Sequence, residues 1–324
     1  MTNRLHRSLF LVSFGAVSAV LAAGCGNSDV NFSGSAGSGG STGTGGSTGT
    51  AGSGTGGSTV GTGGSTGTAG SGTGGSTTTS TTAPAEKFSF FVTSLVALQE
   101  LSGSQAGFGG DLRFGETGAG AGLRGADKIC ATIAEKSMPG AGQKTWRAFL
   151  SATADENGNV VNAIDRIGEG PWYDRLGRVF ALQKADLLAD RPTSIDPAIK
   201  DDFPNEDGVP NHAPDPGQGQ VDNHDTLTGT NKNGQLYSST STCKDWTGNT
   251  GTEGKPRVGH SWPRYGGPGG GGGGNNPANW MSALDESGCA PGVNLIEMGP
   301  PDPNSNTVGS GGGYGGFYCF ALTP

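Results

Sequence analysis

The stretch from Gly122 to Ser151, GLRGADKICATIAEKSMPGAGQKTWRAFLS, decides the fold of this chain. Five of its apolar residues recur at i, i+3, i+4, i+7 and i+8, the spacing of one stripe along an α-helix: Ala126, Ile129, Cys130, Ile133 and Ala134. Asp127 lies on the polar side and early, where the helix dipole favours an anion. Met138–Gly140 predicts the end of the helix, because Pro cannot continue it and Gly tolerates a left-handed turn. The alternation from Thr145 to Ser151 then predicts a strand.

The glycines that precede this helix resemble a nucleotide-binding motif but lack its context. Residues 120–125, GAGLRG, match G-x-G-x-x-G. A dinucleotide site needs an apolar strand directly before that motif, and residues 110–117 (GDLRFGET) do not form one. The glycines therefore indicate an ordinary loop.

The N-terminus predicts export and lipid attachment. Arg4 and Arg7 precede an apolar run from Ser8 to Ala23 that is short for a membrane span. The following LAAGC, which ends at Cys25, resembles the lipobox of bacterial lipoproteins, although the usual Leu position holds Ala22. We expect residues 1–24 to be a signal peptide and Cys25 to be acylated, so that the exported protein is anchored to a bacterial membrane, at the outer membrane or cell surface. The alternative is a plain secretory signal with a chance cysteine.

Residues 25–85 form a linker of Gly, Ser, Thr and Ala. Residues 43–59 recur identically at 61–77, but the repeat has no apolar period and cannot bury a face. We expect a disordered, flexible tether with a reach of roughly 40 Å. It is either a stalk for the domain that follows or low-complexity sequence with a loose spacing role.

The net charge of the chain argues against some classes of ligand, and its cysteines indicate how the exported part is cross-linked. The chain carries a formal charge of −8, and this acidic balance argues against nucleic acid, heparin-like polyanions and anionic lipid as ligands. Beyond Cys25 four cysteines remain, an even number that suggests two disulfides in any of three pairings: Cys130, Cys243, Cys289 and Cys319. Zinc is the alternative, but no cysteine pair has C-x2-C spacing.

All Trp and Tyr residues lie beyond residue 85, so residues 86–324 are expected to form one domain. Phe88–Leu98 and Tyr314–Leu322 are apolar on both faces, and we expect them to be buried strands that pair with each other. Shorter elements are predicted at Arg178–Leu182 (strand), Lys184–Asp190 (helix) and Cys243–Trp246 (edge strand or turn).

Several blocks in this domain resemble one known family. They are Phe91–Ser94, Gly122–Asp127 with Cys130, Trp146–Ser151, Asp225–Gly229, Cys243–Thr247, Cys289 and Tyr318–Phe320. In this order they resemble the endostatin domain of collagens, and most closely the endostatin-like domain of unknown function in bacterial surface lipoproteins. The resemblance implies an α+β, C-type-lectin-like fold with paired terminal strands, few helices and long loops. It also implies nested disulfides, Cys130–Cys319 and Cys243–Cys289.

The family's ligand sites do not carry over. The collagen fragment binds zinc through a His-rich N-terminal lead, and this chain has no His between His6 and His212. Its heparin site is an arginine-rich face, whereas this domain is acidic. The calcium motif of sugar-binding lectins is also absent, and a lectin-like fold does not by itself make a lectin.

An acidic loop offers the one candidate cofactor, a structural Ca²⁺. Ca²⁺ takes six to eight hard oxygen ligands, and the candidates are Asp201, Asp202, Asn205, Asp207, Asp222 and Asp225. Their spacing matches no EF-hand, and the alternative is a solvated acidic loop. No other metal or cofactor is indicated.

Neither a catalytic set nor a ligand follows directly from the sequence. His212, His224 and His260 lie near carboxylates, but no G-x-S-x-G or H-E-x-x-H occurs, so no catalytic residue is assigned. Aromatic residues beside Gly/Pro-rich loops would suit ligand stacking if exposed and the core if buried: Trp172, Tyr173, Trp262 and Tyr265. We therefore expect a non-enzymatic surface domain that binds an extracellular protein or glycan. The alternatives are a secreted hydrolase that uses His and Asp of the 207–225 loop and a structural or display protein without a specific ligand.

Overall fold

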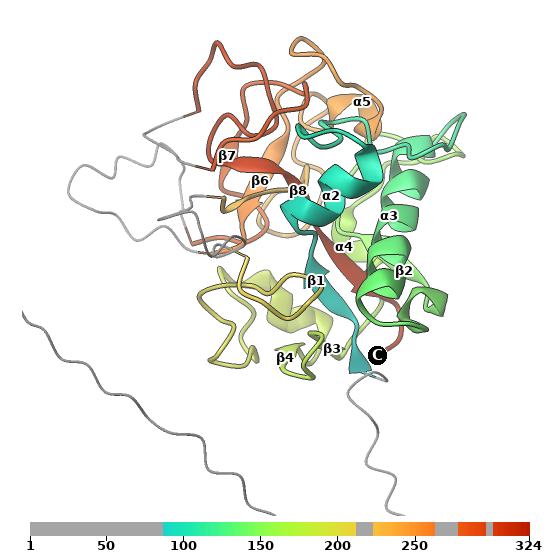
Figure 1. Cartoon of the computed structure of the whole chain (residues 1–324), viewed down its shortest axis with the longest axis vertical. Coiled ribbons are helices and arrows are strands. Elements are labelled where there is room, and N and C mark those ends of the chain that lie inside the picture. The colour runs from blue at the N-terminus through green and yellow to red at the C-terminus, as the bar shows by residue number, and fades with distance from the viewer. Residues whose placement is uncertain (1–86, 212–222, 263–277, 296–300) are drawn as a thin grey trace, which may run out of the picture. The chain divides into compact units, whose positions relative to one another are not determined.

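The folded part of the chain is built around one buried strand, β8 (Gly313–Ala321), and one long helix, α3 (Ala121–Ser137). The computed structural model describes residues 87–211, 223–262, 278–295 and 301–324 (Figure 1). Helices and strands are mixed within the same unit, and the expected α+β class is confirmed. Cys25, the signal peptide and the linker lie outside the described residues.

Helix α3 forms where the apolar stripe predicts it. All five stripe residues are buried. The helix begins after Gly120, whose φ of 71° suits glycine, and ends at Ser137 before extended Met138. Because it begins at Ala121, Asp127 does not lie in its first turn, and the expected dipole role is wrong. Asp127 instead accepts hydrogen bonds from other elements, as described below.

Two glycines of the GAGLRG motif allow close packing against α3. A Cβ at Gly122 would lie 2.1 Å from the carbonyl oxygen of Asp245, and one at Gly125 would lie 2.1 Å from that of Arg113. No side chain fits there, so these glycines serve contacts between the helix and neighbouring loops.

The first strand is shorter than its apolar run. β1 (Phe90–Val92) pairs antiparallel with β8, with Phe90 opposite Phe320, as expected from the sequence. The prediction that the strand continues to Leu98 is wrong, because α2 (Leu95–Ser102) begins there. The Ser94 hydroxyl accepts a hydrogen bond from the backbone N–H of Ala97 and caps this helix at 3.1 Å.

The other edge of β8 is shared by two strands. β2 (Trp146–Ala148) pairs antiparallel with its C-terminal part, and β5 (Asp225–Leu227) runs parallel to its N-terminal part. The sheet continues through β6 (Arg257–His260) to β7 (Leu284–Asp285). β5 and β6 are antiparallel, which places Asp225 directly opposite His260.

Alternate residues of β8 contribute to two hydrophobic clusters, one on each face of the sheet. Phe317, Cys319 and Ala321 join the cluster that contains the apolar face of α3. Tyr318 and Phe320 join a second cluster with Trp280 and aromatic side chains of other segments. The remaining elements are η1 (Ala141–Gln143), α4 (Ala163–Arg166), β3 (Trp172–Tyr173), β4 (Val179–Ala181), η2 (Lys184–Leu188) and α5 (Cys243–Trp246).

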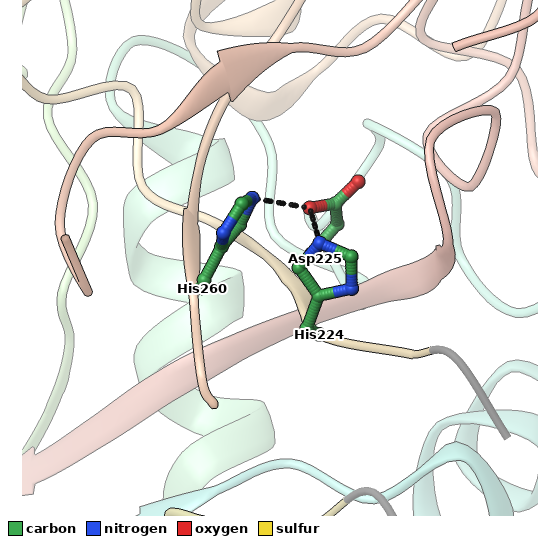
Figure 2. Close-up of side chains that lie close together, drawn as sticks. All are labelled: His224, Asp225 and His260. Carbon is green, nitrogen blue, oxygen red and sulfur yellow. Dashed lines mark ion pairs between the residues drawn. The ribbon is translucent and has the colours of Figure 1, made fainter. Parts of the chain in front are cut away.

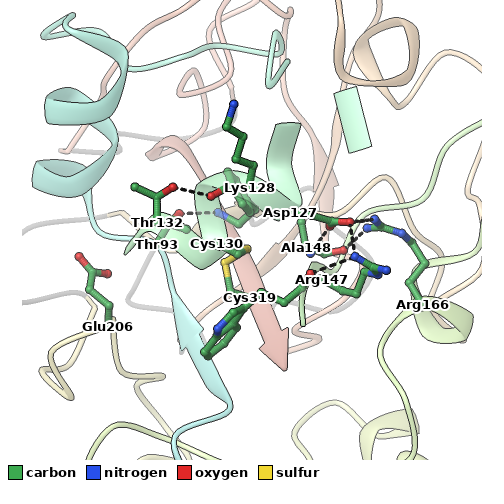
Figure 3. The surroundings of a disulfide bond; sticks show 12 residues. Thr93, Asp127, Lys128, Cys130, Thr132, Arg147, Ala148, Arg166, Glu206 and Cys319 are labelled. Atoms are coloured by element: carbon green, nitrogen blue, oxygen red, sulfur yellow. Dashed lines mark hydrogen bonds and ion pairs between the residues drawn. A yellow bond between two sulfur atoms is a disulfide. The ribbon is translucent and has the colours of Figure 1, made fainter. Parts of the chain in front are cut away.

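Two disulfides join distant parts of the domain. Cys130 bonds to Cys319, which ties α3 to β8 (Figure 3). Cys243 bonds to Cys289. This is the nested pairing that the resemblance implied. Residues 243–246 form a single left-handed turn with φ between 46° and 63°, so the edge-strand alternative is wrong and the turn alternative holds. The indole N–H of Trp246 anchors this turn by donating to the Ser151 carbonyl oxygen at 2.8 Å.

Candidate functional site

A cluster of two histidines and an aspartate lies at one end of strands β5 and β6 (Figure 2). The antiparallel register places Asp225 opposite His260, and His224 directly precedes Asp225. The Asp225 Oδ1 atom lies 3.1 Å from His260 Nε2 and 3.4 Å from His224 Nε2. One potential ligand atom from each residue falls within 4.8 Å of the other two. The pairing of β5 with β6 thus brings three polar side chains together, although the first and the last of them are 36 residues apart in the chain.

A second carboxyl, that of Glu286, adjoins the cluster. Glu286 follows β7 and is completely buried. Its Oε2 atom accepts hydrogen bonds from the Ser310 hydroxyl at 2.5 Å and from the Gly311 N–H at 2.7 Å. A Cβ at Gly311 would lie 2.5 Å from Asp225 Oδ2 and 3.4 Å from Glu286 Oε2, so the glycine segment before β8 borders both carboxyls.

The pKa values of the two buried carboxyls are shifted in opposite directions. Burial by itself raises the pKa of Asp225, but the neighbouring imidazoles of His224 and His260 hold that pKa below its ordinary value. Burial and the charge of Asp225 raise the pKa of Glu286 well above its ordinary value. Asp225 is therefore the anion of the pair, and Glu286 holds its proton more tightly than an exposed glutamate does.

The arrangement suits holding a charge or an ion better than reacting with a substrate. His224, Asp225 and His260 are each 3% exposed or less, whereas a catalytic base must reach the proton it removes. Ser261 is buried as well, and its hydroxyl contacts the backbone carbonyl of His224 at 3.4 Å. His212, the third histidine of the hydrolase hypothesis, lies outside the described residues.

Most of the expected calcium residues do not gather at this cluster. Within the described residues, the only group of three or more His, Cys, Asp or Glu ligands is His224, Asp225 and His260. Asp201 and Asp207 are exposed, and Asp202 is half-buried. The side-chain oxygen of Asn205 accepts from two backbone N–H groups, those of Asp207 and Val209, and so closes a turn. Asp222 lies outside the described residues.

The described aromatic candidates for ligand binding differ in how deeply they are buried. Trp172 is 1% exposed and its indole N–H donates to the Ala321 carbonyl oxygen, so its expected ligand-binding role is wrong and it belongs to the core. Tyr173 is half-buried with the Lys87 ammonium 5.1 Å from its ring centre. Trp262 is half-buried, and its ring lies 5.0 Å from that of His224. Tyr265 lies outside the described residues.

An open groove that the sequence analysis did not identify lies near the second disulfide. Its volume is about 530 Å³, and its lining is rich in hydroxyls with one aromatic ring: Tyr237, Ser238, Thr240, Ser241, Gly251, Thr252, Gly254, Lys255 and Asp285. We call it the Tyr237 groove. Its walls come from segments that adjoin Cys243 and Cys289, and no periodic pattern in the sequence brings them together.

No family model matches the chain, and a search of curated proteins returns no match. Within the described residues, no helix has both the length and the apolar character needed to cross a membrane.

Proposed function

We propose that this protein is an exported, lipid-anchored surface domain that binds a neutral glycan in the Tyr237 groove without catalysing a reaction. The observation that carries the proposal is the lining of that groove, which combines an exposed aromatic ring with hydroxyl groups in several segments. Sugar rings stack their C–H faces on aromatic side chains, and their hydroxyls exchange hydrogen bonds with polar groups around them.

The side chains of the groove are held in place before any ligand arrives. The Arg257 guanidinium lies 4.4 Å from the centre of the Tyr237 ring, while the Tyr237 residue remains 46% exposed. One face of the ring is therefore supported, and the remainder is accessible. The Ser238 hydroxyl lies 2.7 Å from that of Ser241 and 3.2 Å from that of Thr240, a chain of groups that both donate and accept. Such preorganisation lowers the entropy cost of binding.

Charge favours a neutral ligand over an acidic one. Lys255 and Asp285 both line the groove, so its charged side chains are of opposite sign. The chain as a whole carries a net charge of −8 and repels polyanions.

The hydrolase alternative receives less support, because the histidines with described positions are buried beside a carboxylate. The resemblance to endostatin-like, C-type-lectin-like domains of bacterial surface lipoproteins agrees with the non-catalytic proposal. That resemblance implies paired terminal strands and nested disulfides, and the chain has both.

The glycan proposal is tested on an array of neutral oligosaccharides with the purified chain and two variants. Tyr237→Ala should abolish binding, because it removes the stacking surface. Tyr173→Ala is the matched control, since Tyr173 lies in β3 outside the groove, and it should bind as the parent does. Equal loss in both variants, or binding by neither the parent nor the variants, would reject the glycan proposal and favour a protein ligand or a display role.

The anchor is tested separately by mass spectrometry of the mature N-terminus in a bacterial host. We expect cleavage before Cys25, acyl chains on that cysteine and protein in the membrane fraction. Cys25→Ser should release the chain from membranes, since no acyl acceptor remains. An unmodified Cys25 in a soluble mature protein would contradict the proposed anchor.

A further inference from the structure

The buried cluster at the end of β5 and β6 has the geometry of a metal site. Zn²⁺ bonds imidazole nitrogen and carboxylate oxygen at about 2.0–2.2 Å, so two ligand atoms of a tetrahedral ion are separated by about 3.3 Å. The separations from Asp225 Oδ1 to the Nε2 atoms of His260 and His224 are 3.1 Å and 3.4 Å. The two imidazole rings lie 4.1 Å apart at 80° and point toward the same carboxylate (Figure 2).

Three of the four oxygens of the two buried carboxyls at the cluster accept no hydrogen bond of normal geometry within the described residues. They are both oxygens of Asp225 and the Oε1 atom of Glu286. A buried anion without hydrogen bonds is costly unless a cation compensates it. Asp225 is 1% exposed and Glu286 is completely buried, so these oxygens do not face bulk solvent. Of these oxygens, Asp225 Oδ1 lies where the two histidines converge, so it is the oxygen that a cation bound by their imidazoles would contact.

The chemistry of the donors narrows the class of ion. Two imidazoles with a carboxylate suit zinc and neighbouring first-row transition ions, whereas Ca²⁺ takes six to eight oxygens and avoids nitrogen. We propose that His224, Asp225 and His260 bind a divalent transition metal ion of the zinc type. Glu286 acts as a positioning residue, because it adjoins Asp225 and is itself held by Ser310 and Gly311.

The proposed role of this site is structural, and its ligands are different residues from those that line the Tyr237 groove. It joins the end of β6 to the start of β5, and through Glu286 it reaches the segment that leads into β8. An ion here would join the paired ends of β5 and β6. None of the three proposed ligands lines the groove, so the metal and the glycan can be tested independently.

The test begins with the parent protein. The full chain, with both disulfides formed, is treated with a chelator and then titrated with Zn²⁺, Co²⁺ or Ca²⁺. We expect one Zn²⁺ per chain by elemental analysis, visible absorption from bound Co²⁺, and a higher melting temperature with either ion. Calcium should change none of these. Failure of the parent to take up Zn²⁺ and Co²⁺, or a thermal shift with Ca²⁺ alone, would overturn the proposal.

Variants then locate the ion. His260→Gln and Asp225→Asn should lose stoichiometric binding, and Glu286→Gln should bind about 10–100-fold more weakly, because outer partners tune a site without forming it. Asp201→Asn is the control, since Asp201 is acidic, near in sequence and exposed, and it should bind as the parent does.

Near-ultraviolet circular dichroism verifies the fold of each variant. If a ligand variant fails to fold, the Glu286→Gln affinity and the parent titration still decide. Binding unchanged by every folded variant at the cluster would place the metal elsewhere and reject the assignment.

Discussion

At the scale of single residues, the described core uses two buried or partly buried carboxylates to join elements that are distant in sequence. Asp127 on α3 receives the Arg166 guanidinium at 2.8 Å from each oxygen and the backbone N–H of Ala148 at 2.9 Å (Figure 3). Arg147 adds a third contact at 3.1 Å. Glu206 is bonded to the N-terminus of α2, where Ser94 donates its N–H at 3.0 Å and its hydroxyl at 2.5 Å.

Asp127→Asn should destabilise the domain by about 2–3 kcal/mol, measured by chemical unfolding. The change leaves the Arg166 guanidinium, whose side chain is only 12% exposed, without its anionic partner. Glu116→Gln is the control, because Glu116 pairs with Lys128 at a more exposed position and should cost less than about 1 kcal/mol. Equal costs for the two variants would show that Asp127 is not a structural link.

Glu206→Gln should change how stability depends on pH. Burial raises the pKa of Glu206, and its hydrogen bonds with Ser94 offset part of that effect. The folded state therefore holds a proton that the unfolded state releases. The stability from this group is fully present below the ordinary pKa near 4.5 and is lost as pH rises through the higher folded pKa.

The measurement is the melting temperature of parent and variant from pH 4 to pH 8. Relative to the parent, Glu206→Gln should gain stability as pH rises, since glutamine carries no charge to bury. Glu156→Gln, at an exposed glutamate, should keep the pH profile of the parent. A variant curve parallel to that of the parent would disprove the role of Glu206.

At the scale of elements, the α3–β8 contact organises the domain and is held covalently. Alternation along β8 allows one face to pack on α3 and the other on an aromatic cluster, and Cys319 is the residue of the α3 face that bonds back to Cys130. The second bridge secures the left-handed turn at 243–246, a backbone conformation that costs about 1–2 kcal/mol per residue for L-amino acids. A disulfide and the buried Trp246 hold this turn in place.

Removal of each disulfide should cost stability that rises with the logarithm of the length of the loop it closes. Replacing both Cys130 and Cys319 with Ala removes a bond that closes a loop of 189 residues. We expect the free energy of unfolding to fall by about 5 kcal/mol in the chain-entropy model. The paired changes at Cys243 and Cys289 open 46 residues and should cost about 4 kcal/mol. Chemical unfolding of the two double variants measures both, and a larger loss for the shorter loop would show that strain or packing dominates.

At the scale of the whole molecule, the proposed division of labour is a lipid anchor, a tether and a folded domain. The tether sequence has no apolar period with which to contribute to a core. The described core, in contrast, contains its own hydrophobic clusters and both disulfides.

A chain that starts at residue 84 should therefore melt within about 1 °C of the exported chain that starts at Cys25. The reason is that a segment unable to bury apolar surface contributes little to folding free energy. Calorimetry of the two forms measures the difference. A substantially lower melting temperature for the shorter form would mean that the linker packs on the domain.

How far the sequence alone predicted the fold depended on local periodicity. Apolar spacing along the chain predicted three features: the helix α3, the pairing of β1 with β8 and the strand at Val179–Ala181. This spacing is a property of the local sequence and does not depend on which segment packs against it. The boundary at Val92 was missed because an apolar run has the same composition in a strand as in the helix α2. The left-handed turn at 243–246 was only one of two alternatives, since its backbone is imposed by tertiary contacts.

The sequence by itself determined the class of the fold, the four cysteines available for bridging and the acidic, polar character of the loops. Only the tertiary structure decided which polar residues meet. His224, Asp225, His260 and Glu286 converge because antiparallel pairing brings β5 opposite β6, and the Tyr237 groove exists because segments near two bonded cysteines lie side by side. Composition and spacing act along the chain, whereas these sites depend on contacts between segments that lie far apart in it.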